Sequence, residues 1–201
     1  NIYEERNFVI TQTASTTTLS VSPASPINYG TNSNFSCSNN KGLSSSLYIN
    51  GSDKTSENNL NIVRGAGTYN VSCITTGNAN YTANATGVTW NLTVNQATPT
   101  CSLNFNPGSS ITYGTPINVS CSCTNGTVAN LFRNGTGNVT TEINTNVTLG
   151  AGHYNYTCNT SGNTNYTSAT TSSLLSVSKA STLTRLFLNG TEGNRNYNTS
   201  D

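Results

Sequence analysis

Hydrophobic and polar residues alternate along most of the chain, and one alternating stretch occurs twice. Residues 65–81 read GAGTYNVSCITTGNANY and residues 150–166 read GAGHYNYTCNTSGNTNY, identical at 11 of 17 positions. In the first copy Tyr69, Val71 and Cys73 alternate with polar residues, and a period of two places successive side chains on opposite faces of a strand. Each copy is therefore expected to form a strand with one buried face.

The repeat covers most of the chain at an offset of 83 to 85 residues, the length of a small all-β domain. In each repeat, short apolar runs separated by Gly, Pro and Asn-Gly turn signals predict about seven strands. The predicted fold class is all-β, with tandem immunoglobulin-like β-sandwich domains at residues 15–97 and 98–181. Residues 1–14 resemble the last strand of a preceding repeat, and residues 182–201 the first strand of a further repeat or a strand donated to a neighbour.

Charged residues are scarce, so the surface consists mainly of Asn, Ser and Thr. Only 7% of the residues are charged, the formal net charge is +1, and residues 65–132 contain no Asp, Glu, Lys or Arg. Nucleic acids and anionic lipids bind basic surfaces, so the composition excludes nucleic acid as a partner. No apolar run is long enough to span a bilayer, so we expect no direct membrane insertion in this segment.

Sequons for N-glycosylation, Asn-x-Ser/Thr, are more frequent than chance order predicts, and several lie on the solvent phase of a predicted strand. The sixteen acceptors are Asn34, Asn50, Asn70, Asn80, Asn84, Asn91, Asn118, Asn125, Asn134, Asn138, Asn146, Asn155, Asn159, Asn165, Asn189 and Asn198. We expect covalent N-linked glycans at these positions to keep the weakly charged surface soluble. No other cofactor is expected.

The six cysteines, an even number, indicate disulfides and an oxidising compartment. Aligning the two repeats places one cysteine on the second and one on the sixth strand of each, and these strands face each other across a sandwich core. The two cysteines left over lie on neighbouring antiparallel strands of the second repeat. The expected pairs are Cys37–Cys73, Cys121–Cys158 and Cys101–Cys123. The location is extracellular or at the cell surface, and the missing initiator Met and signal peptide suggest a mature or excised portion of an exported protein.

Both ends of the chain carry apolar residues that we expect to serve assembly. They are Phe8, Val9 and Ile10 at the N-terminal end and Leu183, Leu186 and Leu188 at the C-terminal end. A lone strand leaves its backbone groups unpaired, so either the covalent chain continues into further repeats or these strands add to a neighbouring subunit. The expected partners are copies of the chain or adjacent repeats in a fibre, and other surface proteins are possible partners.

The order of landmarks resembles the Ig-like repeats of bacterial and archaeal cell-surface proteins. Tyr-Gly-Thr follows the first strand, Ala-Gly-x-Tyr leads into the sixth, Gly-Asn-x-Asn-Tyr follows it, and Val-x-Gln/Lys-Ala ends the repeat, over residues 15–180. The resemblance implies a stalk, S-layer or filament protein made of tandem sandwiches. The cysteines on both central strands, the shortage of acidic residues and the many sequons depart from many relatives and point to a heavily glycosylated, archaeal version.

A few further residues are of types that can serve in catalysis or binding. His153 is the only histidine and its counterpart in the first repeat is Thr68, so we predict no catalytic role and no enzyme. Asp53 and Glu57 are too few carboxylates for a calcium site. Trp90 shares the strand phase of the apolar residues after it, which predicts a buried ring. The alternative function is an adhesin or glycan-binding surface module, which would use exposed aromatic residues or loops.

Overall fold

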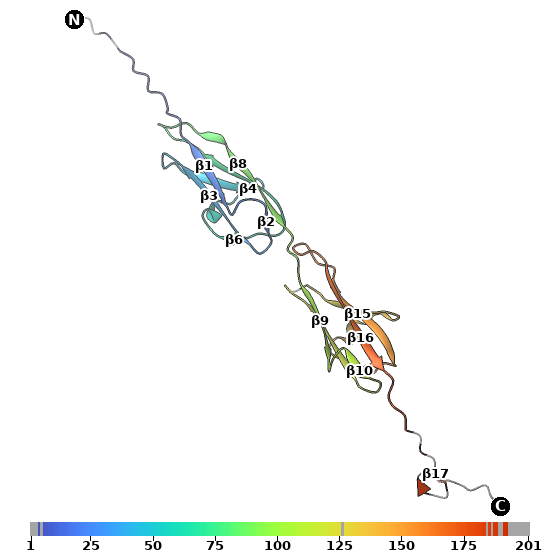
Figure 1. The fold of residues 1–201 in the computed structure, drawn as a ribbon. Helices are drawn as coiled ribbons and strands as arrows, with labels where there is room; N and C mark the ends of the chain where they lie inside the picture. The colour runs from blue at the N-terminus through green and yellow to red at the C-terminus, as the bar shows by residue number, and fades with distance from the viewer. Residues whose placement is uncertain are drawn as a thin grey trace, which may run out of the picture. The chain divides into compact units, whose positions relative to one another are not determined.

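The computed structural model of the protein defines residues 4, 6–125, 127–183, 185, 187–188 and 191–192. Contacts divide the chain into two units. Unit 1 comprises residues 1–100, 123–128 and 160–169, and unit 2 comprises residues 101–122, 129–159 and 170–201. Each unit is built on a β-sandwich (Figure 1), so the predicted all-β, immunoglobulin-like fold class is confirmed. In the part of the chain that the structure describes, no helix is long and apolar enough to cross a membrane.

Eight strands form the sandwich of unit 1. They are β1 (Thr17–Ser22), β2 (Ile27–Asn28), β3 (Asn32–Asn39), β4 (Ser45–Ile49), β5 (Ser52–Asp53), β6 (Ile62–Val63), β7 (Gly67–Thr75) and β8 (Asn84–Asn95). One sheet has the order β1-β3-β6 and the other β2-β8-β7-β4-β5. Pro23 and Pro26 separate β1 from β2, which pairs in parallel with β8 in the opposite sheet. The two prolines therefore end β1, and the chain continues as β2 in the other sheet.

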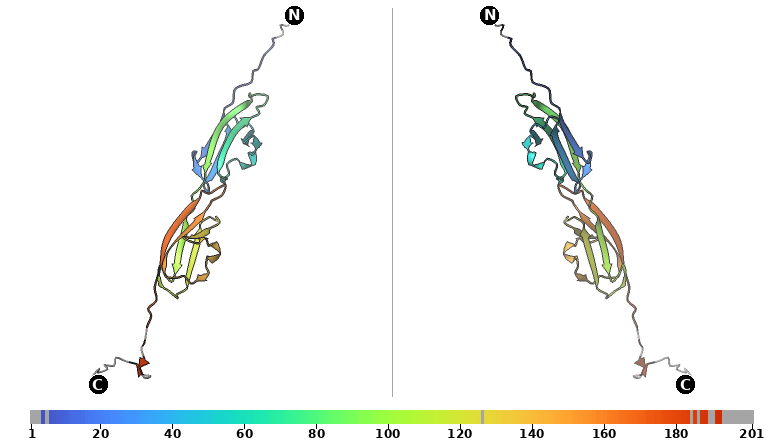
Figure 2. Two further views of the ribbon diagram at one scale, coloured as in Figure 1. Left: turned by 90° about the vertical axis from the view of Figure 1, so that its right-hand side faces the viewer. Right: turned by 90° about the vertical axis from the view of Figure 1, so that its left-hand side faces the viewer.

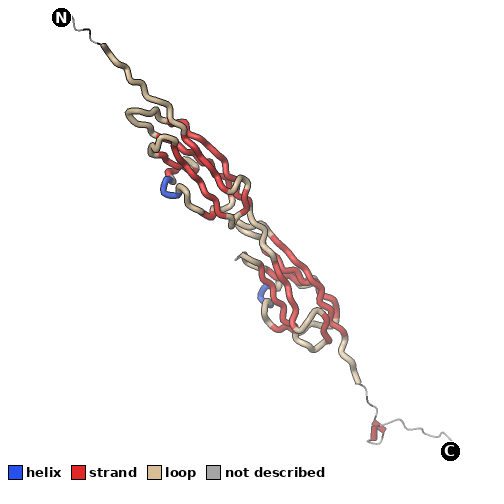
Figure 3. Tube along the Cα trace, turned by 60° about the vertical axis from the view of Figure 1, so that its left-hand side comes forward, coloured by secondary structure: helices blue, strands red, loops and turns tan. Residues whose placement is uncertain are grey.

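Unit 2 follows the same plan. Its strands are β9 (Cys101–Asn106), β10 (Ser110–Thr112), β11 (Ile117–Cys123), β12 (Asn130–Arg133), β13 (Gly137–Asn138), β14 (Asn146–Val147), β15 (Gly152–Thr160) and β16 (Ala169–Ser178). The sheets have the orders β14-β11-β9 and β10-β16-β15-β12-β13, and Figure 2 shows the strands from two further sides. One short 3-10 turn lies in each repeat, η1 (Thr55–Glu57) and η2 (Thr140–Glu142), drawn in blue in Figure 3.

The alternating pattern of the sequence defines both cores. In unit 1 the largest buried side chains are Phe35, Leu47 and Leu92, each at most 1% exposed. In unit 2 Tyr156 and Leu175 are fully buried. Burying one large apolar side chain contributes roughly 1.5–3 kcal/mol, so the inward residues of the strands supply most of the stabilisation of each sandwich.

Disulfides join the two sheets in each sandwich. Cys37 on β3 is bonded to Cys73 on β7, with their Cα atoms 5.4 Å apart. The equivalent pair in the second repeat is Cys121–Cys158, with a Cα–Cα distance of 5.6 Å. Cys101 and Cys123 are disulfide-bonded as well, and none of the six cysteines is free. Cys37–Cys73 and Cys121–Cys158 are two of the three pairs expected from the sequence, and the pair Cys101–Cys123 stays a prediction. Disulfides are typical of a secreted or surface protein.

Candidate functional site

The sequon asparagines lie toward solvent. Asn189 and Asn198 fall outside the described residues, and none of the other sequon asparagines is buried. The half-buried ones are Asn34, Asn84, Asn118, Asn159 and Asn165, and the remaining nine are exposed. The glycosylation sites are therefore accessible, while their occupancy stays a prediction.

Several sequons lie next to one another on the outer faces of the sheets. Asn70 on β7 and Asn91 on β8 are opposite each other in the strand register, and the Asn70 Nδ2 atom donates to Asn91 Oδ1 at 3.1 Å. In unit 2 the Nδ2 atom of Asn118 donates to Oδ1 of Asn146 at 3.2 Å. Glycans on such pairs would cover the same area of sheet surface.

His153, Asp53 and Glu57 are engaged in local contacts. The Nδ1 atom of His153 lies 3.1 Å from the Ser176 hydroxyl on the exposed face of the sheet. A carboxylate oxygen of Asp53 accepts a hydrogen bond from the Thr55 N–H at 2.9 Å, and hydrogen bonds from Thr55 lower the pKa of Asp53. Glu57 is paired with Arg64. These arrangements are those of an ordinary turn and a sheet surface.

Each sandwich holds one glutamate of its short helical turn against an arginine. In unit 1, Arg64 donates to Glu57 at 2.7 Å, and its guanidinium carbon lies 4.8 Å from the centre of the Phe35 ring. In unit 2, Arg133 donates to Glu142 at 2.7 Å and to the hydroxyl of Tyr156 at 3.0 Å. Both arginine side chains are about nine-tenths buried. These ion pairs fix each 3-10 turn to its sandwich.

The two arginines come from different strands. The sequence repeat aligns Arg133, on β12, with Ile49 on β4, and it aligns Arg64, which follows β6, with Leu149. Glu57 and Glu142 are aligned by the sequence repeat, whereas their arginine partners come from two different backbone positions. The sequence repeat alone did not reveal that the arginine comes from a different position in each repeat. The one available signal was Arg133 itself, because an arginine at an inward strand position needs an acidic partner.

The Glu57 ion pair predicts a dependence of stability on pH. Partial burial raises the pKa of Glu57, and the hydrogen bonds from Arg64 and Lys54 lower it by more, so it lies below the ordinary value of 4.5. The ionised carboxylate therefore stabilises unit 1 fully above that value, and this contribution is lost as the pH falls through the folded-state pKa. Glu57→Gln should lower the urea midpoint of unit 1 at pH 7 and leave it nearly unchanged at a pH below the folded-state pKa of Glu57. An equal loss at both pH values would contradict this assignment.

A loop with the sequence Gly-Asn-x-Asn-Tyr-Thr follows the sixth strand in each repeat, at residues 77–82 and 162–167. In the first, the Asn78 side-chain oxygen accepts the N–H groups of Asn80 and Tyr81 at 2.9 and 3.0 Å. In the second, Asn163 accepts the equivalent N–H groups of Asn165 and Tyr166 at 2.9 and 3.1 Å. The two loops therefore have the same internal hydrogen bonding.

Both loops are paired in parallel with the segment that precedes their sandwich. Thr13 donates its N–H to Asn80 O at 2.9 Å and accepts from the Thr82 N–H at 3.0 Å. Ala97 makes the same two bonds with Asn165 and Thr167, at 3.0 and 2.9 Å. Sequence reasoning missed this pairing because each segment contributes a single bridging residue, which is too short for a strand pattern.

The terminal assembly residues are placed only in part. Phe8, Val9 and Ile10 belong to no strand and are 83–93% exposed. Leu183 is 75% exposed, and Leu186 falls outside the described residues. Leu188 belongs to β17 (Phe187–Leu188), which pairs with β18 (Thr191–Glu192). The role of these six residues in assembly stays a prediction.

Trp90 corrects one expectation. Its ring was expected to be buried, but it is 48% exposed, although Trp90 lies opposite the buried Val71 in the strand register. Along β8 full burial begins only at Leu92. The alternation along the strand predicts the face of the sheet on which Trp90 lies. It does not predict how much of a strand of 12 residues is covered by other parts of the protein.

Comparison with known proteins assigns no family to the chain. No protein-family model matches it, and no curated protein is significantly similar to it. Among solved structures, the fibronectin(III)-like modules of Clostridium thermocellum CbhA match at 16% identity and a TM-score of 0.31, over 82% of this chain and 95% of theirs. Drosophila N-cadherin EC1-3 matches at 10% identity and a TM-score of 0.31, over 77% of this chain and 64% of its own. These similarities are too low to carry a functional argument.

Proposed function

We propose that the chain is a structural subunit of an extracellular, heavily N-glycosylated surface filament or stalk, and not an enzyme. The observation that supports this most directly is the distribution of sequons, which lie exposed or half-buried over both sandwiches on a surface almost free of charge. Disulfide-linked sandwiches resist unfolding outside the cell. Electron microscopy of the native material tests the proposal, and finding only isolated globular particles would reject it.

Glycosylation is the first measurable consequence. We expect most of the sixteen sequons to carry sugar, because the described ones reach solvent and few charged groups replace glycans as a source of solubility. Intact-mass spectrometry of the native protein should therefore give a value far above the 21.1 kDa of the bare chain. A mass close to 21.1 kDa would show that the surface is soluble without sugar. Enzymatic deglycosylation should return the mass to that value.

The partners in the filament are copies of the chain or adjacent repeats, joined end to end. A head-to-tail contact that does not close into a ring produces a fibre. Two arrangements of the terminal segments serve this function, a continuous covalent array or strand exchange between subunits. Deleting residues 1–12 separates them, because strand exchange predicts monomers with folded sandwiches and a covalent array predicts unchanged assembly.

An adhesin or glycan-binding module is the second candidate, and the exposed ring of Trp90 is the observation that favours it. Aromatic rings present a flat apolar face to ligands. A glycan array with Trp90→Ala as the control separates the two functions. Binding that disappears in the variant would favour the adhesin, whereas no binding by either protein would favour the structural role.

A further inference from the structure

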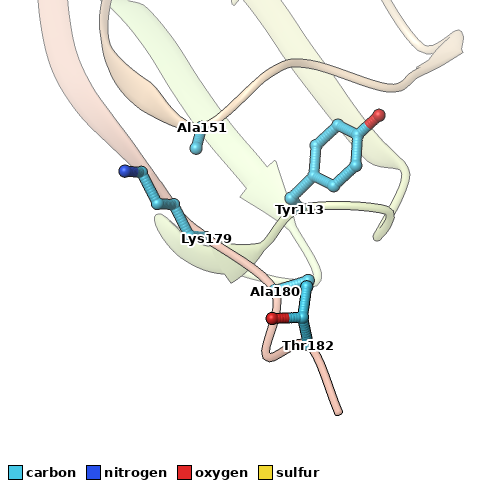
Figure 4. A pocket seen from close by; sticks show the side chains of 5 residues that line it. All are labelled: Tyr113, Ala151, Lys179, Ala180 and Thr182. Atoms are coloured by element: carbon cyan, nitrogen blue, oxygen red, sulfur yellow. The ribbon is translucent and has the colours of Figure 1, made fainter. Parts of the chain in front are cut away.

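An apolar hollow of about 420 Å³ lies at the end of β16 in unit 2. Its lining residues come from three segments, the turn after β10, the turn before β15 and the chain that leaves β16. They are Tyr113, Ala151, Lys179, Ala180 and Thr182, and Figure 4 shows their side chains around the hollow. Tyr113 is 55% exposed, and the other four residues are exposed as well.

Every residue of this hollow has a counterpart in the first repeat. The sequence repeat aligns the five with Tyr29, Ala66, Gln96, Ala97 and Pro99. The backbone is equivalent too, because the Tyr29 N–H donates to Asn95 O and the Tyr113 N–H donates to Ser178 O, both at 2.8 Å. The two surfaces are therefore the same structural feature on successive repeats.

In unit 1 the counterpart surface is covered by the loop at residues 162–167. The Tyr166 ring packs edge-on against Tyr29 with centroids 5.2 Å apart, and the Ala66 N–H donates to Asn165 Oδ1 at 3.0 Å. Gln96 Nε2 donates to the backbone oxygens of Asn163 at 2.9 Å and Thr164 at 3.2 Å. The occupant of the surface is thus a Gly-Asn-x-Asn-Tyr loop, bound through one ring, one amide oxygen and its backbone carbonyls.

The chain carries a second loop of this kind, at residues 77–82, with the same internal hydrogen bonds. Gly77 and Gly162 have φ of 73° and 75°, and a Cβ atom on them would collide with the backbone oxygens of Tyr81 and Tyr166 in the same loops. Asn78 and Asn80 are exposed. The ring of Tyr81 lies 5.7 Å from the Lys41 ammonium, and no aromatic partner like Tyr29 is found for it among the described residues. The second loop is therefore preformed and its ring can receive a partner.

We propose that the loop at residues 77–82 of one chain docks on the hollow of a second copy. Tyr81 packs against Tyr113 of the second copy, and Asn80 Oδ1 accepts the N–H of its Ala151, as Tyr166 and Asn165 do within unit 1. Lys179 takes the place of Gln96 as the donor to the loop carbonyls. The inference rests on the proposed filament function and names its head-to-tail contact.

Docking also replaces the segment that is hydrogen-bonded to the backbone of the loop. Within its own chain the loop is bonded to Thr13 and to Gln12, whose Nε2 atom donates to Asn78 O at 2.7 Å. The sequence repeat aligns Lys179 and Ala180 with Gln12 and Thr13. Residues 12–13 of the same chain and residues 179–180 of the second copy therefore compete for one side of the loop, and only one of them fits. The hydrogen bonds that the loop loses and gains are nearly equivalent. The favourable free energy of docking therefore comes from the tyrosine pair, the hydrogen bond from Ala151 and the filling of the hollow.

The glycosylation proposed above is compatible with this contact. Asn80 and its counterpart Asn165 are both sequon asparagines, and a sugar is attached through the side-chain nitrogen. The contact uses the side-chain oxygen, as the hydrogen bond from Ala66 to Asn165 Oδ1 shows. Asn80 of a glycosylated chain therefore keeps the acceptor that docking requires.

Complementation between two variants tests the proposal on the full-length secreted protein. Tyr113→Ala removes the receiving ring, and Tyr81→Ala removes the docking ring. Each variant should need at least roughly tenfold more protein than wild type to associate in sedimentation velocity, the loss expected for a central interface contact. An equimolar mixture should form dimers but no longer species, because it contains only one intact pair of surfaces. Tyr29→Ala is the matched control and should leave the association concentration within about twofold of wild type, because its ring is already covered inside the chain.

The outcomes separate this inference from the proposed function. A mixture that stays monomeric, or variants that associate like wild type, would overturn the loop contact. Wild type that stays monomeric at millimolar concentration would overturn it as well and would assign the hollow to a following sandwich of a longer covalent chain. Native fibres seen by electron microscopy in either case would leave the filament function standing. Wild type that associates, with native material that shows no fibre, would instead support the contact and reject the filament.

Discussion

Replacing Cys37 and Cys73 together by alanine is expected to lower the free energy of unfolding of unit 1 by about 4 kcal/mol. The disulfide closes a loop with a sequence separation of 36 residues and so restricts the unfolded chain. Both cysteines are also buried, at 4% and 0% exposure, so losing their sulfur contacts adds to the effect. A loss this large is a substantial part of the 5–15 kcal/mol that typically holds a domain folded.

Urea unfolding measured by tryptophan fluorescence is suited to this prediction. The chain has one tryptophan, Trp90, which lies on β8, so its signal reports unit 1 alone. Ser36→Ala with Ser72→Ala is the matched control, because these serines are the neighbours of the two cysteines on β3 and β7 and are only half-buried. A double cysteine variant that loses less than about 1 kcal/mol would show that native-like structure in the unfolded chain already imposes the restraint.

Arg133→Met is expected to destabilise unit 2 by about 2 kcal/mol. Breaking a fully buried ion pair typically costs 3–5 kcal/mol, and we reduce this figure because the Glu142 side chain is 22% exposed and water can solvate it in part. The variant also removes the donor to the Tyr156 hydroxyl, whose pKa is raised by its burial. Far-ultraviolet circular dichroism during urea unfolding measures the change, with Trp90 fluorescence following unit 1 separately.

Two further variants identify the cause of that loss. Arg133→Met combined with Glu142→Gln should recover part of the stability, because no unpaired charge then remains near the core. Arg133→Ile combined with Leu149→Arg copies the arrangement of unit 1 and should restore the ion pair from the other backbone position. If neither double variant is more stable than Arg133→Met, the loss comes from packing of the arginine stem and not from its charge.

The sequence predicted the sandwich well where a simple period decides the structure. Alternation identified the buried faces of β3, β7 and β15. Alignment of the repeats gave the pairs Cys37–Cys73 and Cys121–Cys158 that the structure contains, because strand order determines which cysteines face each other. Trp90 was misjudged because phase along a strand says nothing about what covers the residue. The covering of Tyr29 by Tyr166 was also missed, since a repeat shows which residues are equivalent and not which ones meet.

The arginine that pairs with each glutamate has a consequence for how the two repeats can evolve. A recombination between the repeats with its crossover between the two arginine positions gives two hybrids, and neither keeps one arginine for its one glutamate. A hybrid with Ile49 from the first repeat and Leu149 from the second would have no arginine for its glutamate. The reciprocal hybrid, with Arg133 and Arg64, would have two. Selection against both products would keep this segment of each repeat inherited as a block, and the repeats would continue to diverge there while the rest of their sequence is free to become alike.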